Sequence, residues 1–373
     1  MPSFSPFLRV KPLLGKLVRL FPFLLPSKAP SFQGVQAWIT TRCNLKCKFC
    51  YKTVIGTPFF EMSKETFCRI AESSRHVGLT LLGLGEPLLH PNFREFVEIW
   101  KTRVRGPVGF STNGTLIDDE MARELVKIGV DEIVFSIDGM NRTYEEIRKG
   151  SDFELVLENI KQLHHLKGGR KARPTLGLTF VGLTENIEQF PMLLKLLSPF
   201  VTHAKFNHVA PYSREIAALH LFRAPRGKVV RIFNEARRIA KENNIRLSLR
   251  PLEPFPDRAC EEPWTSPYVT PDGTVYPCCI LGDHHRLQFM EYFEDSCLSY
   301  NLEQYAMGNV MEQKQNLKEI WNNDRFKAFR ARLLITFWKT RSRRYTVEEY
   351  VRIRERGSNF FCDICSLRWG CVC

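Results

Sequence analysis

Three cysteines stand close together in the stretch Cys43-Asn44-Leu45-Lys46-Cys47-Lys48-Phe49-Cys50, which follows the apolar run 35–39. Thiolates are good ligands for iron and zinc, so three of them in one short loop can bind a single metal centre. The next cysteine along the chain is Cys68, which lies inside a predicted helix. The loop therefore supplies three ligands, and an open fourth position is typical of a site that does chemistry rather than of a structural site.

The remaining cysteines indicate metal binding as well. Of the 12 cysteines, four stand at the end of the chain in a C-x2-C-x5-C-x-C spacing, Cys362, Cys365, Cys371 and Cys373. Such spacings are typical of metal ligands rather than of a disulfide framework, which predicts a reducing, cytoplasmic setting. Two alternatives stay open for the first loop: a zinc site completed by a distant histidine, and three unrelated cysteines.

From residue 35 onward, short apolar strands alternate with amphipathic helices, a pattern that predicts an α/β fold with a parallel sheet. We expect helices at 63–74 and 118–128, capped by Ser63 and Asp118. We expect six strands, at 35–40, 78–83, 107–111, 131–137, 175–181 and 203–209. Right-handed crossovers would bring the carboxyl ends of all six strands to one rim, where functional side chains of such folds gather.

Polar side chains and glycines do follow three of these strands. The second strand is followed by Gly83-Leu84-Gly85-Glu86-Pro87 and the third by Ser111-Thr112-Asn113-Gly114. The fourth continues into Ser136-Ile137-Asp138-Gly139, and Arg148 comes shortly afterwards. The alternation of Ser136 and Asp138 places both on one face of their strand.

The last third of the chain carries a second pattern. Cys260 is followed by a predicted β-hairpin with an Asp272-Gly273 turn, which would bring Cys278 back toward Cys260. Next come Gly308-Asn309-Val310 and Leu317-Lys318-Glu319-Ile320-Trp321, and then the final cysteines.

Together these motifs resemble the radical S-adenosylmethionine (radical SAM) superfamily and its SPASM subfamily. The resemblance implies a partial (β/α)6 TIM-like barrel with a small C-terminal cysteine-rich SPASM-type domain. It implies that Cys43, Cys47 and Cys50 hold a [4Fe-4S] cluster whose free iron binds S-adenosyl-L-methionine. It further implies that the cofactor is contacted by Phe49, Gly85, Glu86, Ser111, Asn113, Ser136 and Asp138.

The resemblance also implies one or two auxiliary [4Fe-4S] clusters. The full two-cluster extension of the family has seven cysteines, with a C-x3-C step that this chain lacks. We expect one auxiliary cluster, held by Cys260, Cys278, Cys362 and Cys365. Cys371 is an alternative ligand, and Cys279, Cys371 and Cys373 are candidates for a second cluster.

The charge of the chain is unevenly spread. The formal net charge is +14, and the segment 325–356 holds eleven Lys or Arg against three acids. Residues 1–30 carry further basic side chains among apolar ones, a pattern that suits either peripheral membrane contact or a helix packed across the enzyme domain, whereas a nucleic-acid partner is disfavoured. We expect four parts: a basic amphipathic extension (1–32), the core barrel (33–225), a helix and linker (226–257), and the auxiliary iron-sulfur domain (258–373).

These features predict an oxidoreductase or maturase. Such an enzyme cleaves S-adenosylmethionine reductively to a 5′-deoxyadenosyl radical, which takes hydrogen from a substrate. The resemblance favours oxidative modification of a peptide or protein side chain, with ferredoxin or flavodoxin as the low-potential donor. The alternative is radical modification or decarboxylation of a small cofactor or lipid precursor. A more remote alternative is a non-catalytic iron-sulfur or zinc protein.

Overall fold

The computed structural model describes residues 29–250, 260–283, 288–293, 296–312, 315–340, 362 and 371–372. The amphipathic segment predicted within residues 1–28, the basic residues 341–356, Cys365 and Cys373 lie outside these described residues. Membrane contact through the N-terminal segment stays a prediction. Within the described part of the chain, no helix is long and apolar enough to cross a membrane.

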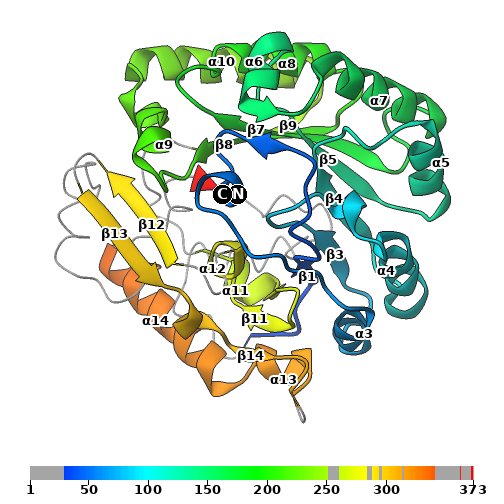
Figure 1. The fold of residues 1–373 in the computed structure, drawn as a ribbon, viewed down its shortest axis with the longest axis vertical. Helices are drawn as coiled ribbons and strands as arrows, with labels where there is room; N and C mark the ends of the chain where they lie inside the picture. Colours follow the sequence, from blue (N-terminus) through cyan, green and yellow to red (C-terminus); the bar gives the residue numbers. More distant parts are fainter. Residues whose placement is uncertain are drawn as a thin grey trace.

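Six parallel strands form the arc that Figure 1 shows, and they confirm the predicted α/β architecture. Each pairs in parallel with the next one along the arc. They are β1 (Gly34–Ala37), β3 (Gly78–Leu81), β4 (Val108–Thr112), β5 (Glu132–Ser136), β7 (Thr175–Gly182) and β8 (His203–Val209). Because all six run in the same direction, their carboxyl ends meet at one rim.

Helices cover the outside of the arc (Figure 1). They include α3 (Lys64–Glu72), α4 (Phe93–Ile99), α5 (Asp119–Lys127), α6 (Asn141–Ile147), α7 (Phe153–Leu166), α8 (Gln189–Leu197), α9 (Arg214–Ala218) and α10 (Arg226–Glu242). Both predicted N-caps are confirmed, since the Ser63 hydroxyl accepts a hydrogen bond from the Thr66 amide and the Asp118 carboxylate accepts one from the Met121 amide.

Aromatic contacts between strands and helices identify the outer face of β4 and of β8. Phe110 of β4 packs edge-to-face on Phe93 of α4, and Phe206 of β8 packs in the same way on Phe233 of α10. Because side chains alternate along a strand, the residues on either side of Phe110 and Phe206 face the inside of the arc. Ser111 and Lys205 are two of these inward residues.

The sheet does not end at β8. Strand β9 (Arg246–Leu249) pairs in parallel with β8, and α10 packs on α8. From sequence we place a helix and linker at 226–257. The helix is confirmed, but residues 246–249 form a strand of the main sheet. The short run Arg246-Leu247-Ser248-Leu249 does not indicate this strand in the sequence.

C-terminal residues lie at both edges of the arc. Strand β10 (Tyr268–Val269) pairs in parallel with β1, and β15 (Cys371–Val372) pairs in parallel with β8. The predicted hairpin is confirmed, because β10 pairs antiparallel with β11 (Thr274–Tyr276) around Gly273, whose φ is +86°. The edge continues into β14 (Gly308–Asn309), while β12 (Gln288–Phe293) and β13 (Ser296–Asn301) form a separate hairpin.

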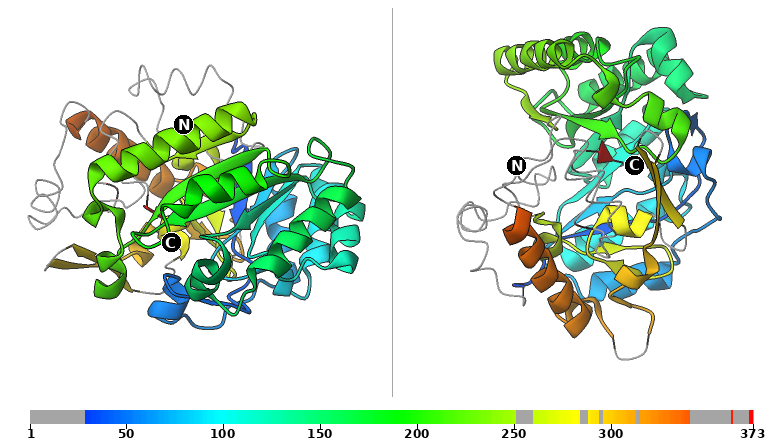
Figure 2. Two further views of the ribbon diagram at one scale, coloured as in Figure 1. Left: turned by 90° about the horizontal axis from the view of Figure 1, so that it is seen from above. Right: turned by 90° about the vertical axis from the view of Figure 1, so that its left-hand side faces the viewer.

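Four helices complete the C-terminal part: α11 (Glu262–Thr265), α12 (Cys279–Asp283), α13 (Leu317–Trp321) and α14 (Asp324–Thr340). Figure 2 shows α14 and α10 on opposite sides of the molecule. Arg330 of α14 is fully buried, stacks over Trp321 at 4.3 Å and donates to the Pro263 carbonyl at 2.7 Å. It therefore joins α14 to α13 and α11.

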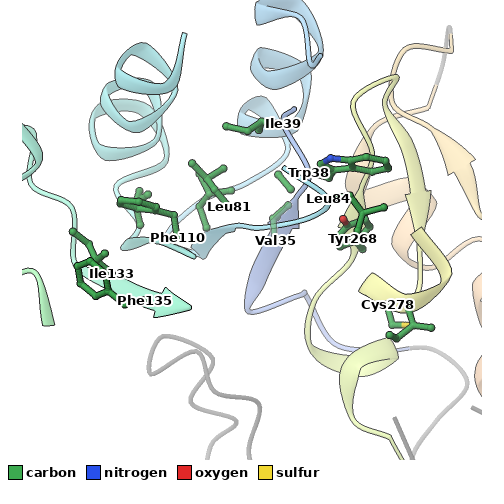
Figure 3. Close-up of a cluster of buried hydrophobic side chains, with 14 of the residues drawn as sticks. Val35, Trp38, Ile39, Leu81, Leu84, Phe110, Ile133, Phe135, Tyr268 and Cys278 are labelled. Atoms are coloured by element: carbon green, nitrogen blue, oxygen red, sulfur yellow. The ribbon is translucent and has the colours of Figure 1, made fainter. Parts of the chain in front are cut away.

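The barrel and the C-terminal part share one hydrophobic core. Figure 3 shows Val35, Leu81 and Phe110 in the same buried cluster as Tyr268 and Cys278 of the C-terminal part. Tyr268 and Val35 are fully buried or nearly so. Burial of this much apolar surface across the boundary stabilises the two parts as a unit.

Candidate functional site

The three-cysteine loop lies at the carboxyl rim. Its strand β2 (Lys46–Cys47) pairs antiparallel with β6 (Arg148–Lys149), and Cys50 precedes the short helix α2 (Tyr51–Val54). Cys47 is buried, Cys43 and Cys50 are half-buried, and the three thiols interact electrostatically with one another. Burial raises the pKa of Cys47 to about 12 and also raises that of Cys43. A bound metal centre acts in the opposite direction, because it favours the thiolate form of its ligands.

The donor set suits an iron-sulfur cluster. It consists of three thiols from one loop, and sulfur is the ligand atom of such clusters. Among the described residues, no three His, Cys, Asp or Glu side chains are arranged to hold a single metal ion. The sulfur-only set still fits a multi-iron group that takes one thiolate per iron.

Asn44 ties the loop to the end of β4. Its side-chain oxygen accepts a hydrogen bond from the Asn113 amide group at 2.9 Å, and its own amide group donates to the Thr115 hydroxyl at 2.8 Å. The Asn113 oxygen in turn accepts from the Thr115 amide and hydroxyl. The predicted Asn113 thus holds the loop that contains the cysteines. The Asn44 contact is absent from the sequence-based predictions, because no spacing rule links residues 69 positions apart.

Arg148 connects a cysteine with Asp138. The guanidinium donates to the Asp138 carboxylate at 2.6 and 2.7 Å and lies 3.8 Å from the Cys47 sulfur. The other Asp138 oxygen accepts from the Val181 amide at 2.7 Å. Asp138 is completely buried, so both of its oxygens are engaged within the protein. Its contacts are with Arg148 and β7.

Glu86 is buried behind the loop. Its carboxylate accepts hydrogen bonds from the backbone amide of Asn113 at 2.7 Å, the Thr112 hydroxyl at 3.0 Å and the backbone amide of Leu88 at 3.3 Å. Burial raises the pKa of Glu86 to about 7, although these three donors favour the charged form. A carboxylate has about four acceptor sites, so one is left for a further donor.

Gly85 is required by a close backbone contact within the protein itself. The approach of the cofactor to this glycine, which we expect from sequence, stays a prediction. In the structure, a Cβ at position 85 would lie 2.1 Å from the Thr40 carbonyl oxygen and 2.9 Å from that of Arg42. The Glu86 amide also donates to the Arg42 carbonyl at 2.7 Å. Gly85 therefore allows the segment that leads into Cys43 to pass against the β3 turn.

The remaining predicted cofactor contacts occupy the rim and the inner face. Ser111 and Ser136 are half-buried at inward positions of β4 and β5. Phe49 is buried in a small apolar cluster with Val181 and Val209, at the ends of β7 and β8. The Tyr212 hydroxyl donates to the Phe49 carbonyl at 2.6 Å and helps to fix the loop, a contact that the sequence does not indicate.

The C-terminal cysteines come from several elements. Cys278 and Cys362 are buried, whereas Cys260 and Cys279 are half-buried and interact electrostatically with each other. In the backbone register, Cys371 lies opposite His208 of β8. Cys365 lies outside the described residues, so the structure describes three of the four expected ligands of the auxiliary cluster.

Residues 39–197 match the Radical SAM superfamily, and residues 260–366 match SPASM, an iron-sulfur cluster-binding domain. A Pyrococcus furiosus protein, the tungsten-containing aldehyde ferredoxin oxidoreductase cofactor-modifying protein, is 30% identical over 301 residues, covering 78% of this chain and 81% of that protein. The Fe-coproporphyrin III synthase of Methanosarcina barkeri is 31% identical over 183 residues, 46% of this chain and 44% of that one.

The chain therefore belongs to the radical SAM superfamily and carries a SPASM domain. It is an enzyme, and its cofactors are S-adenosylmethionine and [4Fe-4S] clusters. Chemistry of this kind requires a reductant and a substrate.

Two solved structures share the fold. Streptococcus suis SuiB bound to S-adenosylmethionine has a TM-score of 0.59 at 14% identity, covering 80% of this chain and 68% of that one. anSMEcpe with bound AdoMet and Cp18Cys peptide has a TM-score of 0.57 at 17% identity, covering 88% and 86%. These likenesses confirm the partial barrel with its C-terminal extension.

Proposed function

We propose that this radical SAM/SPASM enzyme modifies a small organic molecule, such as a cofactor precursor. The support is the Pyrococcus furiosus relative, which matches over most of both chains and is named for modifying a cofactor. Peptide modification, which the sequence favours, is supported by solved structures that share only the fold. It stays the second candidate.

The observation that carries the radical chemistry in this proposal is the three-thiol loop tied to the ends of β3 and β4. We assign Cys43, Cys47 and Cys50 as the ligands of the catalytic cluster. When bound, that cluster passes an electron to S-adenosylmethionine, whose cleavage provides the 5′-deoxyadenosyl radical that takes hydrogen from the substrate. The protein contributes by orienting the reactants and excluding water.

Glu86 is the proposed acceptor for the amino group of S-adenosylmethionine. Three donors already fix its carboxylate, so it costs little side-chain entropy to present the remaining acceptor site. Charge-assisted hydrogen bonds to a buried carboxylate are strong, and a cationic donor would keep Glu86 ionised. Asn113 supports this site through the loop rather than through a free amide group.

Asp138 acts through Arg148 in this scheme. The carboxylate orients the guanidinium, and one guanidinium nitrogen faces the Cys47 sulfur. Hydrogen bonds to ligand sulfurs tune iron-sulfur sites. Ser111 and Ser136, on the inner face, are proposed to contact the nucleoside part of the cofactor, and Phe49 to pack beside the adenine.

The auxiliary cluster is proposed to use Cys260, Cys278, Cys362 and Cys365, with Cys371 as the alternative to one of them. Such a cluster provides an exit for an electron from the substrate radical, which makes a net oxidation possible. The external donor is proposed to be a ferredoxin or flavodoxin, since the catalytic cluster must work at low potential.

The test is anaerobic purification and reconstitution, followed by iron and sulfide analysis and by detection of 5′-deoxyadenosine after dithionite reduction. About eight irons per chain would support one auxiliary cluster, and about twelve would support two. Zinc in place of iron, with no 5′-deoxyadenosine, would overturn the proposal. Peptide libraries and small-molecule extracts, compared for stimulation of 5′-deoxyadenosine formation, separate the two substrate classes.

A further inference from the structure

Side chains on the inner face of the barrel are less buried than those on the outer face. Along five strands, from β3 to β8, half-buried side chains sit at inward positions next to fully buried outward ones. They are Thr80, Ser111, Val134, Ser136, Thr179 and Lys205. Because a tightly filled interior would bury these residues as completely as their outward neighbours, the space between the strands is accessible.

Lys205 is the basic member of this inner face. In the strand register Ser136 lies opposite Thr179, and Thr179 lies opposite Lys205. Neighbouring strands are about 4.8 Å apart, so the three side chains form one polar row across β5, β7 and β8. The row runs from Ser136, which we assign to the cofactor, through Thr179 to Lys205, and Ser248 of β9 continues it in the register.

The other side of Lys205 faces the C-terminal part. Lys205 interacts electrostatically with Glu262 of α11 and with Cys279 of α12. Glu262 accepts hydrogen bonds from Gln36 at 2.5 Å and from Ser266 at 3.2 Å, which fix its position near β1. Lys205 therefore lies between the cofactor side of the barrel and the cysteines of the C-terminal part.

Among the described residues, Lys205 has one basic and one acidic neighbour. Lys205 and Arg250 repel each other, whereas Glu262 is the carboxylate that attracts both. Within the described residues, Lys205 has neither a hydrogen bond nor an ion pair, so its ammonium group is available to an anionic ligand on the inner face.

We propose that Lys205 binds an anionic group of the substrate, a carboxylate or a phosphate, in the space enclosed by the strands. This inference rests on the proposed function and narrows it to small molecules that carry such a group. An anion there would provide an ion-pair partner for the Lys205 ammonium group. It would also hold the rest of the substrate near Ser136 and the cofactor.

The test uses the full-length, anaerobically reconstituted protein with S-adenosylmethionine bound. Inorganic pyrophosphate and malonate are the probes, titrated calorimetrically at constant ionic strength. We expect the wild type to bind at least one probe and Lys205→Met to bind it about tenfold more weakly or worse. Lys205→Arg should retain most of the affinity because it keeps the charge. Lys171→Met, which removes an exposed lysine, is the matched control and should bind like the wild type.

Several outcomes would overturn the inference. They are failure of the wild type to bind either probe, equal binding by Lys205→Met, and an equal loss of affinity in Lys171→Met. Weakened S-adenosylmethionine binding in Lys205→Met would also overturn it, since Lys205 would then serve the cofactor. Iron content and 5′-deoxyadenosine formation are measured on the same preparation, so failure of the proposed function is seen separately from failure at Lys205.

Discussion

The two cysteine-bearing regions of this protein are built in opposite ways. The first region, Cys43–Cys50, is a single loop whose position is fixed by Asn44, Arg148 and the turn at Gly85. The second draws Cys260, Cys278 and Cys362 from segments up to about 100 residues apart in the chain, and the pairing of β10 with β1 and the packing of α14 on α11 help to place these segments. The first region can be predicted from a local sequence motif. The arrangement of the second region depends on which segments pair with the edge strands of the sheet.

The largest expected effect separates the two regions directly. Cys47→Ala should abolish 5′-deoxyadenosine formation, because the catalytic cluster loses one of three ligands. Cys362→Ala should lower iron by about four atoms per chain and leave measurable S-adenosylmethionine cleavage. Iron analysis and chromatographic detection of 5′-deoxyadenosine check both variants. Equal loss of cleavage in the two variants would mean that the regions are not functionally separate.

The next largest effect is a loss of stability on replacing the arginine that supports each region. Arg148→Met leaves the buried Asp138 carboxylate without its counter-charge and should destabilise the protein by about 3 to 5 kcal/mol. Arg330→Met removes hydrogen bonds to the Pro263 carbonyl and the Asn322 side chain, which are uncharged, and should cost about 1 to 3 kcal/mol. Urea unfolding under anaerobic conditions measures both.

The double variant Arg148→Met with Asp138→Asn provides the control for this comparison. It removes the uncompensated charge and should recover part of the lost stability. A double variant no more stable than Arg148→Met alone would show that packing, and not the buried carboxylate, sets the cost.

A smaller effect is expected at Gly85. Gly85→Ala would push a methyl group against the Thr40 carbonyl, so the segment leading into Cys43 must shift. We expect incomplete iron incorporation and destabilisation by about 1 to 3 kcal/mol. Gly227→Ala in α10, where a Cβ meets no atom within 4 Å, is the matched control and should be neutral or stabilising. Full iron loading in Gly85→Ala would contradict the inference that the segment leading into Cys43 needs a glycine at position 85.

The smallest effect concerns the amino end of the barrel, away from both cysteine regions. Glu132 and His203 lie 3.2 Å apart there, in space left by Gly109 and Gly177. Burial raises the pKa of Glu132 from 4.5 to about 8 and lowers the pKa of His203 from 6.5 to about 4. Asp131 and Arg246 also act on this pair. The uncharged form of both groups is therefore favoured.

The sign of the pH dependence follows from these pKa values. Between pH 4.5 and 8 the folded protein holds the Glu132 proton more tightly than the unfolded chain, so the stability from this group falls as pH rises. His203 opposes this only below pH 6.5, where the unfolded chain binds the extra proton. From pH 6.5 to 8, Glu132→Gln should gain stability relative to wild type, by at most about 1.4 kcal/mol per pH unit. Unfolding curves at several pH values check this, and a constant difference would contradict it.

Much of the architecture follows from the sequence alone. All six strands of the arc are confirmed, because short apolar runs between amphipathic helices have few other solutions than parallel βα units. Three local predictions are also confirmed, the helix caps at Ser63 and Asp118 and the Asp272-Gly273 hairpin. Each of them depends only on residues close together in the sequence. The three-cysteine loop is equally local, and its spacing leads to the family.

Only the tertiary structure decides how distant residues meet. Pairing of β9 with β8 and of β10 with β1, the contact of Asn44 with Asn113 and the passage of the backbone at Gly85 join segments that sequence periodicity treats as independent. In the sequence Lys205 is one lysine in a strand, and only the assembled arc places it on an inner face where it interacts electrostatically with Glu262. Local propensity determines elements, whereas burial and charge balance depend on neighbours brought together from far along the chain.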